Sequence, residues 1–516
     1  MGLDGATRAI LPALEEFLRF DNQDLAATQY SRWHDDLNES LPDQGVGAAT
    51  TLEILRRVVI PHGSRIGAPG FAGWITTMPT VVPAVAAFAA TIAGAQRWFF
   101  QSHNFLEHLA LEWLKQLLQL GPFYQGTFTS GGSVANLIAL GAARQKACEV
   151  RGIDASDEGI GVLQKPRIYA SNQVHHVVHR AAAVLGLGRC ALVQLPTDAA
   201  FRLELHALRN QLYLDRANGC TPIAVVASAG TVNTGAIDPL RELAEFCRNE
   251  QLWLHVDGAY GAFGILDPDL APQFEGLSNA DSIAVDPHKW MAVPVGCGAT
   301  FVRDRELLRR SFALGSAAYL EGSAHEVQLI GSQFDGLAHK FHDFNVEQSA
   351  QSRGVTVWAA LKEIGAEGMR TRIRTHNSFA RRLEAHVHAS PVLESLAPVT
   401  LSICCFRYVP IELDGRTEDE MPLLNKLNKE ILKRLLHEHR FTPSSTELNG
   451  AFAIRPCYIN PRTSSAEVDG LVGSVERLGT QVWEEHKESR QVSSENSKSA
   501  TADSIPPDGH NRGASK

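Results

Sequence analysis

The chain has 516 residues, of which 44% are hydrophobic and 20% charged, and its formal net charge is −9. This length and composition allow one large core or several modest ones, which excludes a disordered or fibrous protein. The negative charge, without a cluster of lysines and arginines, argues against nucleic-acid binding, because such proteins neutralise phosphates with basic side chains.

The first segment, residues 1–95, is predicted to be helical, since ATRAILPALEEFLRF and ATTLEILRRVVI space their apolar residues three and four apart. Residues Pro79–Ala95 are almost free of polar groups and could be mistaken for a membrane span. The stretch is short for a span, contains two prolines and is followed by Arg97. We therefore expect a buried helix packed against other protein, and no membrane insertion.

Residues 96–364 alternate helix-like runs with short apolar runs rich in β-branched residues, and this order predicts an α/β domain. The strand candidates are RIYAS, CALVQLP, PIAVVASAG, LWLHVDGAY, SIAVDPHK and GATFVRD. Such alternation is typical of a mostly parallel sheet with helices on both faces. Ligands of these sheets lie at the carboxyl ends of the strands.

Residues 365–484 predict a smaller α+β domain. A long helical stretch, MRTRIRTHNSFARRLEAHVHA, leads into the probable strands TLSICCFRY and FAIRPCYI, which are separated by the helix EMPLLNKLNKEILKRLLHEH. Residues 485–516 are a polar mixture without periodicity, and we expect a disordered tail there.

Eight cysteines are placed irregularly and include no CxxC pair, which favours a reducing compartment. The first residues have no basic stretch followed by an apolar one, so we expect no secretory signal. Both observations predict a cytoplasmic protein.

Two strand ends carry residues of complementary chemistry. In SIAVDPHKWMAVP the strand ends at Asp286, Pro287 breaks it, and Lys289 follows in the turn, where its amine could form an imine with a carbonyl. In LWLHVDGAYGAFG a strand ends with Asp257, beside the small residue Ala259. A carboxylate there can pair with a protonated pyridine nitrogen and keep the ring an electron sink. Taken singly, a surface lysine and a turn aspartate are equally ordinary interpretations.

Two further motifs lie near strand ends. GTFTSGGSVANLIAL runs through Gly132 and Ser133 directly into a helix, whose free N–H groups would bind a phosphate, although such turns usually only cap helices. SNQVHHVVHR places His175 and His179 four residues apart. No third ligand has zinc-like spacing nearby, so we expect no metal; stacking of one imidazole on a ring, or ordinary packing, is favoured.

These four motifs, in this order, resemble the group II pyridoxal-phosphate decarboxylases, the family of aromatic-amino-acid, histidine, glutamate and cysteine-sulfinate decarboxylases. The resemblance extends from Pro61-His62 to IRPCYINPRTSSAEVDGLVGSVERLG. It implies the pyridoxal-phosphate-dependent transferase fold of type I, the cofactor pyridoxal 5'-phosphate, an amino-acid substrate, and a homodimer with the site at the subunit interface and with residues 1–95 packing on the partner subunit.

Carried over position by position, the resemblance assigns each site residue a role. Lys289 holds the cofactor and Asp257 pairs with its pyridine nitrogen. Ala259 lies under the ring and His175 stacks on its other face. The phosphate or the rest of the cofactor is contacted by Gly132, Ser133, Thr231 and His288. Asp286 stands where some members have Asn, and a carboxylate repels a phosphate unless it is protonated or hydrogen-bonded elsewhere.

Tyr319, in the Gly- and Ser-containing segment SAAYLEGSAHEV, resembles the mobile-loop tyrosine that protonates the substrate carbon after carbon dioxide leaves. A structural loop tyrosine is the alternative. Relatives with Phe at this place tend to be oxidative, so Tyr favours plain decarboxylation.

The substrate is the most open point. Several aromatic residues fall in segments that line the substrate entrance in the family, and they favour an aromatic amino acid: Phe71, Trp74, Trp98, Phe99 and Phe100. Alternatively, Arg65, Arg97 or His103 could serve an acidic side chain, as in a glutamate, aspartate or cysteine-sulfinate decarboxylase. An oxidative-deaminating enzyme and a catalytically silent relative are further alternatives.

Overall fold

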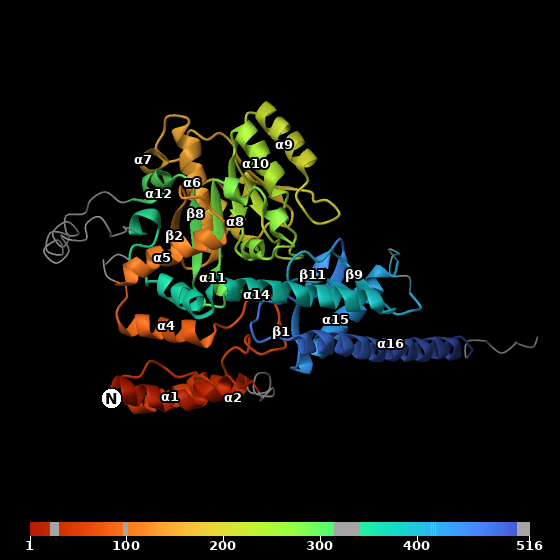
Figure 1. Cartoon of the computed structure of the whole chain (residues 1–516). Helices are drawn as coiled ribbons and strands as arrows, with labels where there is room; N and C mark the ends of the chain where they lie inside the picture. Colours follow the sequence, from red (N-terminus) through yellow and green to blue (C-terminus); the bar gives the residue numbers. More distant parts are fainter. Residues whose placement is uncertain are drawn as a thin grey trace, which may run out of the picture.

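The computed structural model describes residues 1–20, 30–95, 102–313, 341–413, 415, 417 and 419–502. Its largest unit is a seven-stranded sheet of order β2-β8-β7-β6-β5-β3-β4 (Figure 1). The strands are β2 (Gln125–Thr129), β3 (Pro166–Ser171), β4 (Leu192–Leu195), β5 (Thr221–Ser228), β6 (Trp253–Asp257), β7 (Ser282–Val285) and β8 (Gly298–Val302).

Five adjacent strands of this sheet, β7, β6, β5, β3 and β4, run parallel, and β8 is antiparallel to both of its neighbours. Neighbouring residues of a strand face different cores: Val225 belongs to one apolar cluster and Val226 to another. Helices therefore cover both faces, which confirms the predicted mostly parallel α/β architecture.

The helices of this large unit are α5 (Ser102–Leu117), α6 (Gly132–Glu149), α7 (Ala155–Glu158), α8 (Val177–Val184), α9 (Leu205–Ala217), α10 (Leu240–Glu250), α11 (Pro287–Trp290) and α12 (Arg305–Phe312). Local sequence explains their starts. Pro287 occupies the first turn of α11, where its missing N–H costs nothing. Asp304 caps α12 by accepting hydrogen bonds from the backbone N–H groups of Glu306 and Leu307.

A second, five-stranded sheet has the order β1-β11-β12-β10-β9 and lies to the right in Figure 1. Its strands are β1 (Phe71–Ala72), β9 (Leu393–Ser395), β10 (Phe406–Tyr408), β11 (Thr442–Leu448) and β12 (Ala451–Arg455). Helices α14 (Gly354–Ala389), α15 (Met421–His437) and α16 (Ser465–Ala502) pack on it around a separate core. The N-terminal segment was predicted to be helical throughout. It also contributes an edge strand here, because β1 pairs in parallel with β11.

Helix α14 belongs to both units. It contacts α4 and α5 on one side and α16 and β9 on the other. At Gly365 the backbone leaves helical geometry (φ 67°, ψ 178°), which suits a glycine because a side chain strains this conformation. The predicted boundary between residues 364 and 365 thus coincides with the kink at which the two helical segments of α14 meet.

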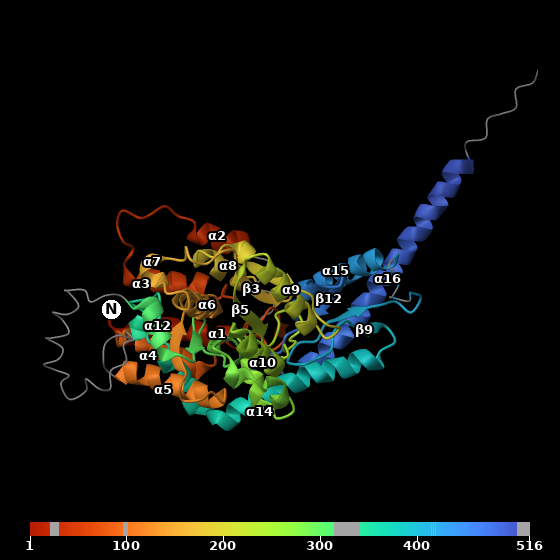
Figure 2. The same cartoon turned by 90° about the horizontal axis from the view of Figure 1, so that it is seen from above.

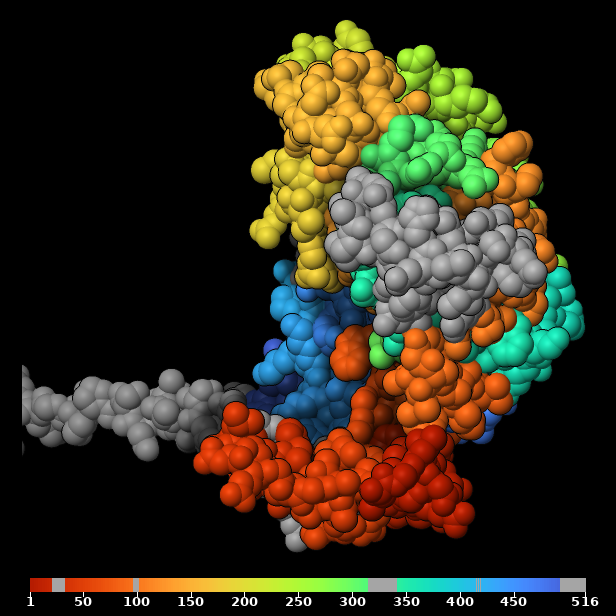
Figure 3. Space-filling view, turned by 90° about the vertical axis from the view of Figure 1, so that its left-hand side faces the viewer, coloured from red at the N-terminus to blue at the C-terminus, as the bar shows by residue number. Residues whose placement is uncertain are grey.

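The N-terminal segment forms a layer at the base of the molecule, coloured red to orange in Figures 1 and 3. It contains α1 (Leu3–Phe17), α2 (Tyr30–Leu37), α3 (Gly47–Ile54), the π-helical turn Leu55–Val59 and α4 (Val81–Ile92). Helix α1 has no buried residue, so this layer packs only loosely on the rest of the chain.

The helix predicted at Pro79–Ala95 is present, but the single chain buries it only in part. Helix α4 buries only Pro83 and Ala90, whereas Val85 and Phe88 are 59% and 48% exposed. Its inner side packs on α14, and nothing described covers its outer side. No helix in the described part of the chain is long and apolar enough to cross a membrane.

The first part of the predicted disordered tail differs from the structure, because α16 continues past residue 485 to Ala502 and projects from the molecule (Figure 2). Residues 503–516 lie outside the described residues. Glu485 accepts two hydrogen bonds from Arg434, and Lys487 forms an ion pair with Glu412. The projecting part of the helix therefore starts from anchored residues, and the sequence from Glu485 to Ala502 contains no glycine or proline.

Candidate active site

A cavity of about 880 Å³ opens at the carboxyl ends of β5, β6 and β7, between the two sheets. Eight of the nine predicted site residues line it: Gly132, Ser133, His175, Thr231, Asp257, Ala259, His288 and Lys289. The ninth, Tyr319, lies outside the described residues, as do Arg97, Trp98, Phe99 and Phe100. The carboxyl edge of the sheet is where α/β enzymes bind their ligands.

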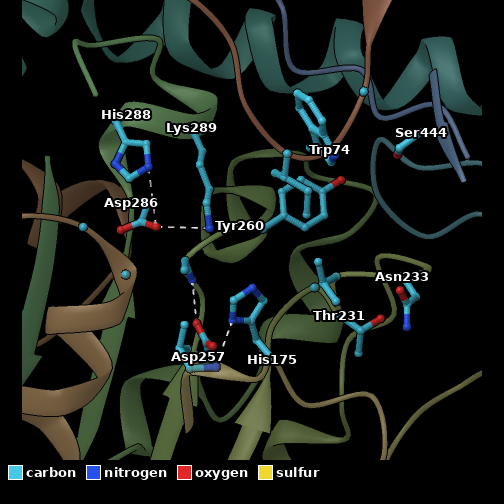
Figure 4. Close-up of a pocket in the computed structure, with 18 of the residues that line it drawn as sticks. Trp74, His175, Thr231, Asn233, Asp257, Tyr260, Asp286, His288, Lys289 and Ser444 are labelled. Atoms are coloured by element: carbon cyan, nitrogen blue, oxygen red, sulfur yellow. Dashed lines mark hydrogen bonds and ion pairs between the residues drawn. The ribbon is translucent and has the colours of Figure 1, made fainter. Parts of the chain in front are cut away.

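Lys289 reaches into the cavity from the short helix α11 (Figure 4). Its Nζ lies 3.1 Å from Oδ2 of Asp286, whose side chain is 2% exposed. The other oxygen of this carboxylate, Oδ1, has no hydrogen-bond partner among the described residues. The amine is therefore held at one defined place by a buried charge.

Asp257 and His175 face this amine from the opposite wall (Figure 4). Oδ1 of Asp257 accepts a hydrogen bond of 3.1 Å from the backbone N–H of Ala259, which fixes the carboxylate at the end of β6. Nδ1 of His175 accepts one of 3.3 Å from the N–H of Val177. Burial lowers the pKa of His175, and the Asp257 carboxylate opposes this shift only in part, so the ring is neutral near neutral pH.

The glycine turn before α6 forms a third wall. Gly131 has φ 137°, a conformation that a side chain strains, and Gly132 begins the helix. A Cβ on Gly132 would lie 2.6 Å from Oδ2 of Asp286 and 3.3 Å from Cβ of Ala259, so only glycine allows this close approach. The first N–H groups of a helix lack partners within it and favour an anion such as phosphate.

Thr231 and His288 complete the predicted set. The hydroxyl of Thr231 lies 3.0 Å from that of Thr234 and accepts a hydrogen bond from the N–H of Ala236, so it stiffens the turn after β5. Nδ1 of His288 lies 2.8 Å from the carbonyl oxygen of Cys297, and its Nε2 lies 3.9 Å from Oδ2 of Asp286.

Arg455, which the motifs did not predict, comes from β12 of the small sheet and is 3% exposed. It donates hydrogen bonds to the carbonyl oxygens of Trp74, Val232 and Asn233 and to the hydroxyl of Ser444. It thereby joins the two sheets and the segment after β1 at the cavity. A charged residue inside the apolar run FAIRPCYI was the signal that could have found it.

Tyr260 was also missed. Its ring stacks on that of Trp290, next to Lys289, at 5.2 Å, and its hydroxyl lies 2.6 Å from that of Ser402. Nε1 of Trp290 in turn donates a hydrogen bond of 2.9 Å to Nδ1 of His376, whose pKa is lowered to about 3 by burial. The lysine-bearing helix is therefore packed against neutral, fully buried partners.

One cavity thus brings together an amine, a carboxylate at a neighbouring strand end, a histidine and the start of a helix. This combination defines a class: α/β enzymes in which a lysine binds a cofactor that carries a carbonyl group. The model of the pyridoxal-dependent decarboxylase conserved domain matches residues 98–409. The chain is 32% identical over 455 residues to an aromatic-L-amino-acid decarboxylase of Bacillus atrophaeus, covering 86% of this chain and 88% of that one. A relative of the same name from Cavia porcellus is 28% identical, covering 83% and 86%.

Solved structures show the same fold. Oryza sativa TDC, solved with PLP and tryptamine, superposes with a TM-score of 0.83 at 22% identity, covering 93% of this chain and 99% of that one. Mouse CSAD superposes with a TM-score of 0.81 at 23% identity, covering 92% and 98%. The chain belongs to the pyridoxal-dependent decarboxylase family. It is a pyridoxal-phosphate-dependent amino-acid decarboxylase, a carboxy-lyase, as the sequence motifs predicted.

The residues present fit the cofactor. The lysine amine can bind its aldehyde, and the Asp257 carboxylate can face its pyridine nitrogen. The turn at Gly131 and Gly132, where a side chain would strain the backbone at Gly131 and a Cβ would collide at Gly132, could hold its phosphate. When bound, the cofactor supplies an electron sink for the bond that breaks at the substrate's α-carbon. The protein's own part is to orient the substrate and to exclude water.

Proposed function

We propose that this enzyme decarboxylates an aromatic L-amino acid to the corresponding amine and carbon dioxide. The observation that carries the proposal is the convergence of Lys289, Asp257 and His175 on one cavity that Phe71, Trp74 and Ile75 also line. The two relatives described above, both named aromatic-L-amino-acid decarboxylase, support the same substrate class.

We assign the site residues the following roles within this proposal. Lys289 binds the cofactor, Asp257 pairs with the pyridine nitrogen, and Ala259 and His175 lie on the two faces of the ring. Gly132 and Ser133 hold the phosphate end, and Thr231 and His288 contact the cofactor or its phosphate. Tyr319 delivers the proton to the substrate carbon.

The outer cavity wall suits an aromatic side chain. Its apolar part is formed by residues of the β1 segment and of helix α15: Phe71, Trp74, Ile75, Leu432 and Leu436. This part lies next to the polar residues Thr442, Ser444 and Ser445 of β11. The rings of Phe71 and Trp74 lie 6.1 Å apart. Trp74 has a left-handed backbone (φ 50°), and its carbonyl oxygen accepts a hydrogen bond from Arg455, so its position is fixed at some cost in strain.

An acidic substrate would need a free cation for its second carboxylate. In the described part of the cavity wall, Lys289 is paired with Asp286, and Arg455 donates to four oxygen acceptors. Arg65, a candidate for this role from the sequence, stacks on Phe20 instead and does not line the cavity. These contacts favour the aromatic alternative.

The proposal includes a homodimer. Helix α4 presents an outer apolar face formed by Val81, Val85, Phe88 and Ile92, which are 57%, 59%, 48% and 55% exposed. A contiguous apolar face of this kind is typical of a protein interface. We also propose a cytoplasmic location, which is supported by eight cysteines that are all unpaired.

The test is carbon dioxide release by the purified, cofactor-loaded protein across the L-amino acids, with the product identified by mass spectrometry. We expect amine from an aromatic amino acid and no turnover by Lys289→Ala. Amine from glutamate, aspartate or cysteine sulfinate alone would contradict the substrate class. Aldehyde with peroxide would instead indicate an oxidative enzyme; one relative, 24% identical, is named phenylacetaldehyde synthase.

A further inference from the structure

A buried chain of side chains connects strands β6 and β7 to the first turn of α6, and none of the roles assigned above uses it. Its members are Trp253, Ser282, His255 and Asn136. The last three have no exposed surface, and Trp253 is 9% exposed. Four polar side chains buried together are costly unless each finds its partner.

The contacts form one continuous path. Nε1 of Trp253 donates to Oγ of Ser282 at 2.8 Å, and this oxygen lies 2.9 Å from Nδ1 of His255. Nε2 of His255 lies 2.9 Å from Oδ1 of Asn136. Nδ2 of Asn136 then donates to the carbonyl oxygen of Gly132 at 2.8 Å.

The direction of each hydrogen bond follows from its ends. The Gly132 carbonyl only accepts, so the NH₂ group of Asn136 must face it and Oδ1 must face His255. Nε2 of His255 therefore carries the proton, and its Nδ1 accepts the hydroxyl hydrogen of Ser282. Trp253 occupies the free lone pair of that hydroxyl. Each contact along the path thus joins one donor to one acceptor when the imidazole is neutral.

The electrostatics agree with this direction. Burial lowers the pKa of His255 to about 4, although the nearby Asp257 carboxylate opposes the shift. At neutral pH the ring is uncharged, as the path requires. A second proton on the ring would remove the acceptor that Ser282 needs.

We infer that His255 and Asn136 are positioning residues for the cofactor. His255 lies two residues before Asp257 on β6, and Asn136 holds the carbonyl of Gly132 at the start of α6. The path therefore fixes the carboxylate that faces the ring nitrogen relative to the turn that faces the phosphate. The inference rests on the roles proposed above for Asp257 and Gly132.

This placement matters because the cofactor is a rigid molecule that must meet both walls at once. In metal sites, loss of a group behind the direct ligands typically costs about tenfold or more in affinity, and we expect a loss of the same order here. Loss of either partner here would also leave a buried polar group unsatisfied. The expected consequence is weaker cofactor binding, beyond any general loss of stability.

The experiment is a titration of cofactor-stripped protein with pyridoxal phosphate, followed by the visible absorbance of the lysine-linked cofactor. We expect Asn136→Ala and His255→Ala to raise the dissociation constant about tenfold or more. His255→Gln should recover most of the affinity, because its amide can still donate to Asn136.

Asn428 provides a matched control. It is also a fully buried helix asparagine whose Nδ2 donates to a carbonyl four residues earlier, that of Leu424, and whose Oδ1 accepts a hydrogen bond, from the N–H of Tyr408. It lies in the small domain, away from the cavity lining. Asn428→Ala should lower the melting temperature about as much as Asn136→Ala while leaving the dissociation constant unchanged.

The outcomes separate this inference from the proposed function. Unchanged affinity in Asn136→Ala overturns the inference, as does an equal loss in Asn428→Ala. If His255→Ala does not fold, His255→Gln and Asn136→Ala decide the matter. Asp257→Ala is measured in parallel. If this variant keeps full affinity for pyridoxal phosphate, the role proposed for Asp257 is wrong. If Asp257→Ala loses affinity and the His255 and Asn136 variants do not, only the positioning role of His255 and Asn136 is wrong.

Discussion

The lysine of the cavity is held by a carboxylate that is itself almost fully buried. Asp286 lies 3.1 Å from the amine, against the glycine turn where the phosphate is expected. A second negative charge at the cofactor's phosphate costs binding energy, since like charges repel more strongly in a poorly solvated site. Asp286 therefore places the amine but opposes the anion.

This conflict leads to a prediction for Asp286→Asn, which keeps the shape of the side chain and removes its charge. We expect the variant to bind pyridoxal phosphate several-fold more tightly, because the repulsion is gone. The measurement is the dissociation constant from quenching of intrinsic fluorescence, with wild-type protein as reference. Weaker binding would contradict the prediction and show that pairing with Lys289 outweighs the repulsion.

At the scale of single residues, the sequence predicted those site members that follow a strand within a recognisable motif. Lys289 and Asp257 were of this kind, because a parallel sheet brings its strand ends to one edge. Arg455 and Asn136 could not be assigned a place in the site in this way. The first reaches it from the other sheet, and the role of the second depends on a hydrogen bond to His255, which is distant in the sequence.

At the scale of elements, strands with β-branched apolar runs were predicted, and those without them were missed. β11 is TPSSTEL, with little apolar character, and β9 has three residues. β2 lies at the sheet edge. It contains polar threonines, and it was not predicted as a strand but only as the residues before the glycine turn. Pairing partners stabilise these strands, and such partners are not visible in the local sequence.

For helices α4 and α16, the composition of the sequence was clear, but the prediction of their packing was incomplete. The apolar run of α4 indicated a helix, but not which of its faces the chain itself would cover. The polar composition after residue 485 suggested disorder, although ion pairs from Glu485 and Lys487 to the small domain anchor the base of a continuous helix. In both cases the composition indicated the character of the segment, but the sequence did not show which surface the segment packs against.

At the scale of the whole molecule, the exposed face of α4 and the loosely packed α1 suggest that a single chain leaves its N-terminal layer unfinished. A second copy that covers this layer would remove exposed apolar side chains from water. In the proposed homodimer, the second copy therefore completes the packing of the N-terminal layer.

The corresponding prediction concerns Val85→Glu combined with Phe88→Glu on the outer face of α4. We expect wild-type protein to sediment as a dimer and the double variant to shift toward monomer, because two charges would be buried without partners. Tyr213→Glu, at a 75% exposed position on α9, is the control and should stay dimeric. A double variant with an unchanged dimer mass would exclude α4 from the interface.

The central claim is that Lys289 carries pyridoxal phosphate in the cavity between the two sheets. The most direct measurement is borohydride reduction of the purified, cofactor-loaded protein, followed by proteolysis and mass spectrometry of the modified peptide. The account predicts a phosphopyridoxyl group on Lys289 in wild-type protein and none at that peptide in Lys289→Ala. A stable modification on another lysine, with Lys289 unmodified, would contradict it.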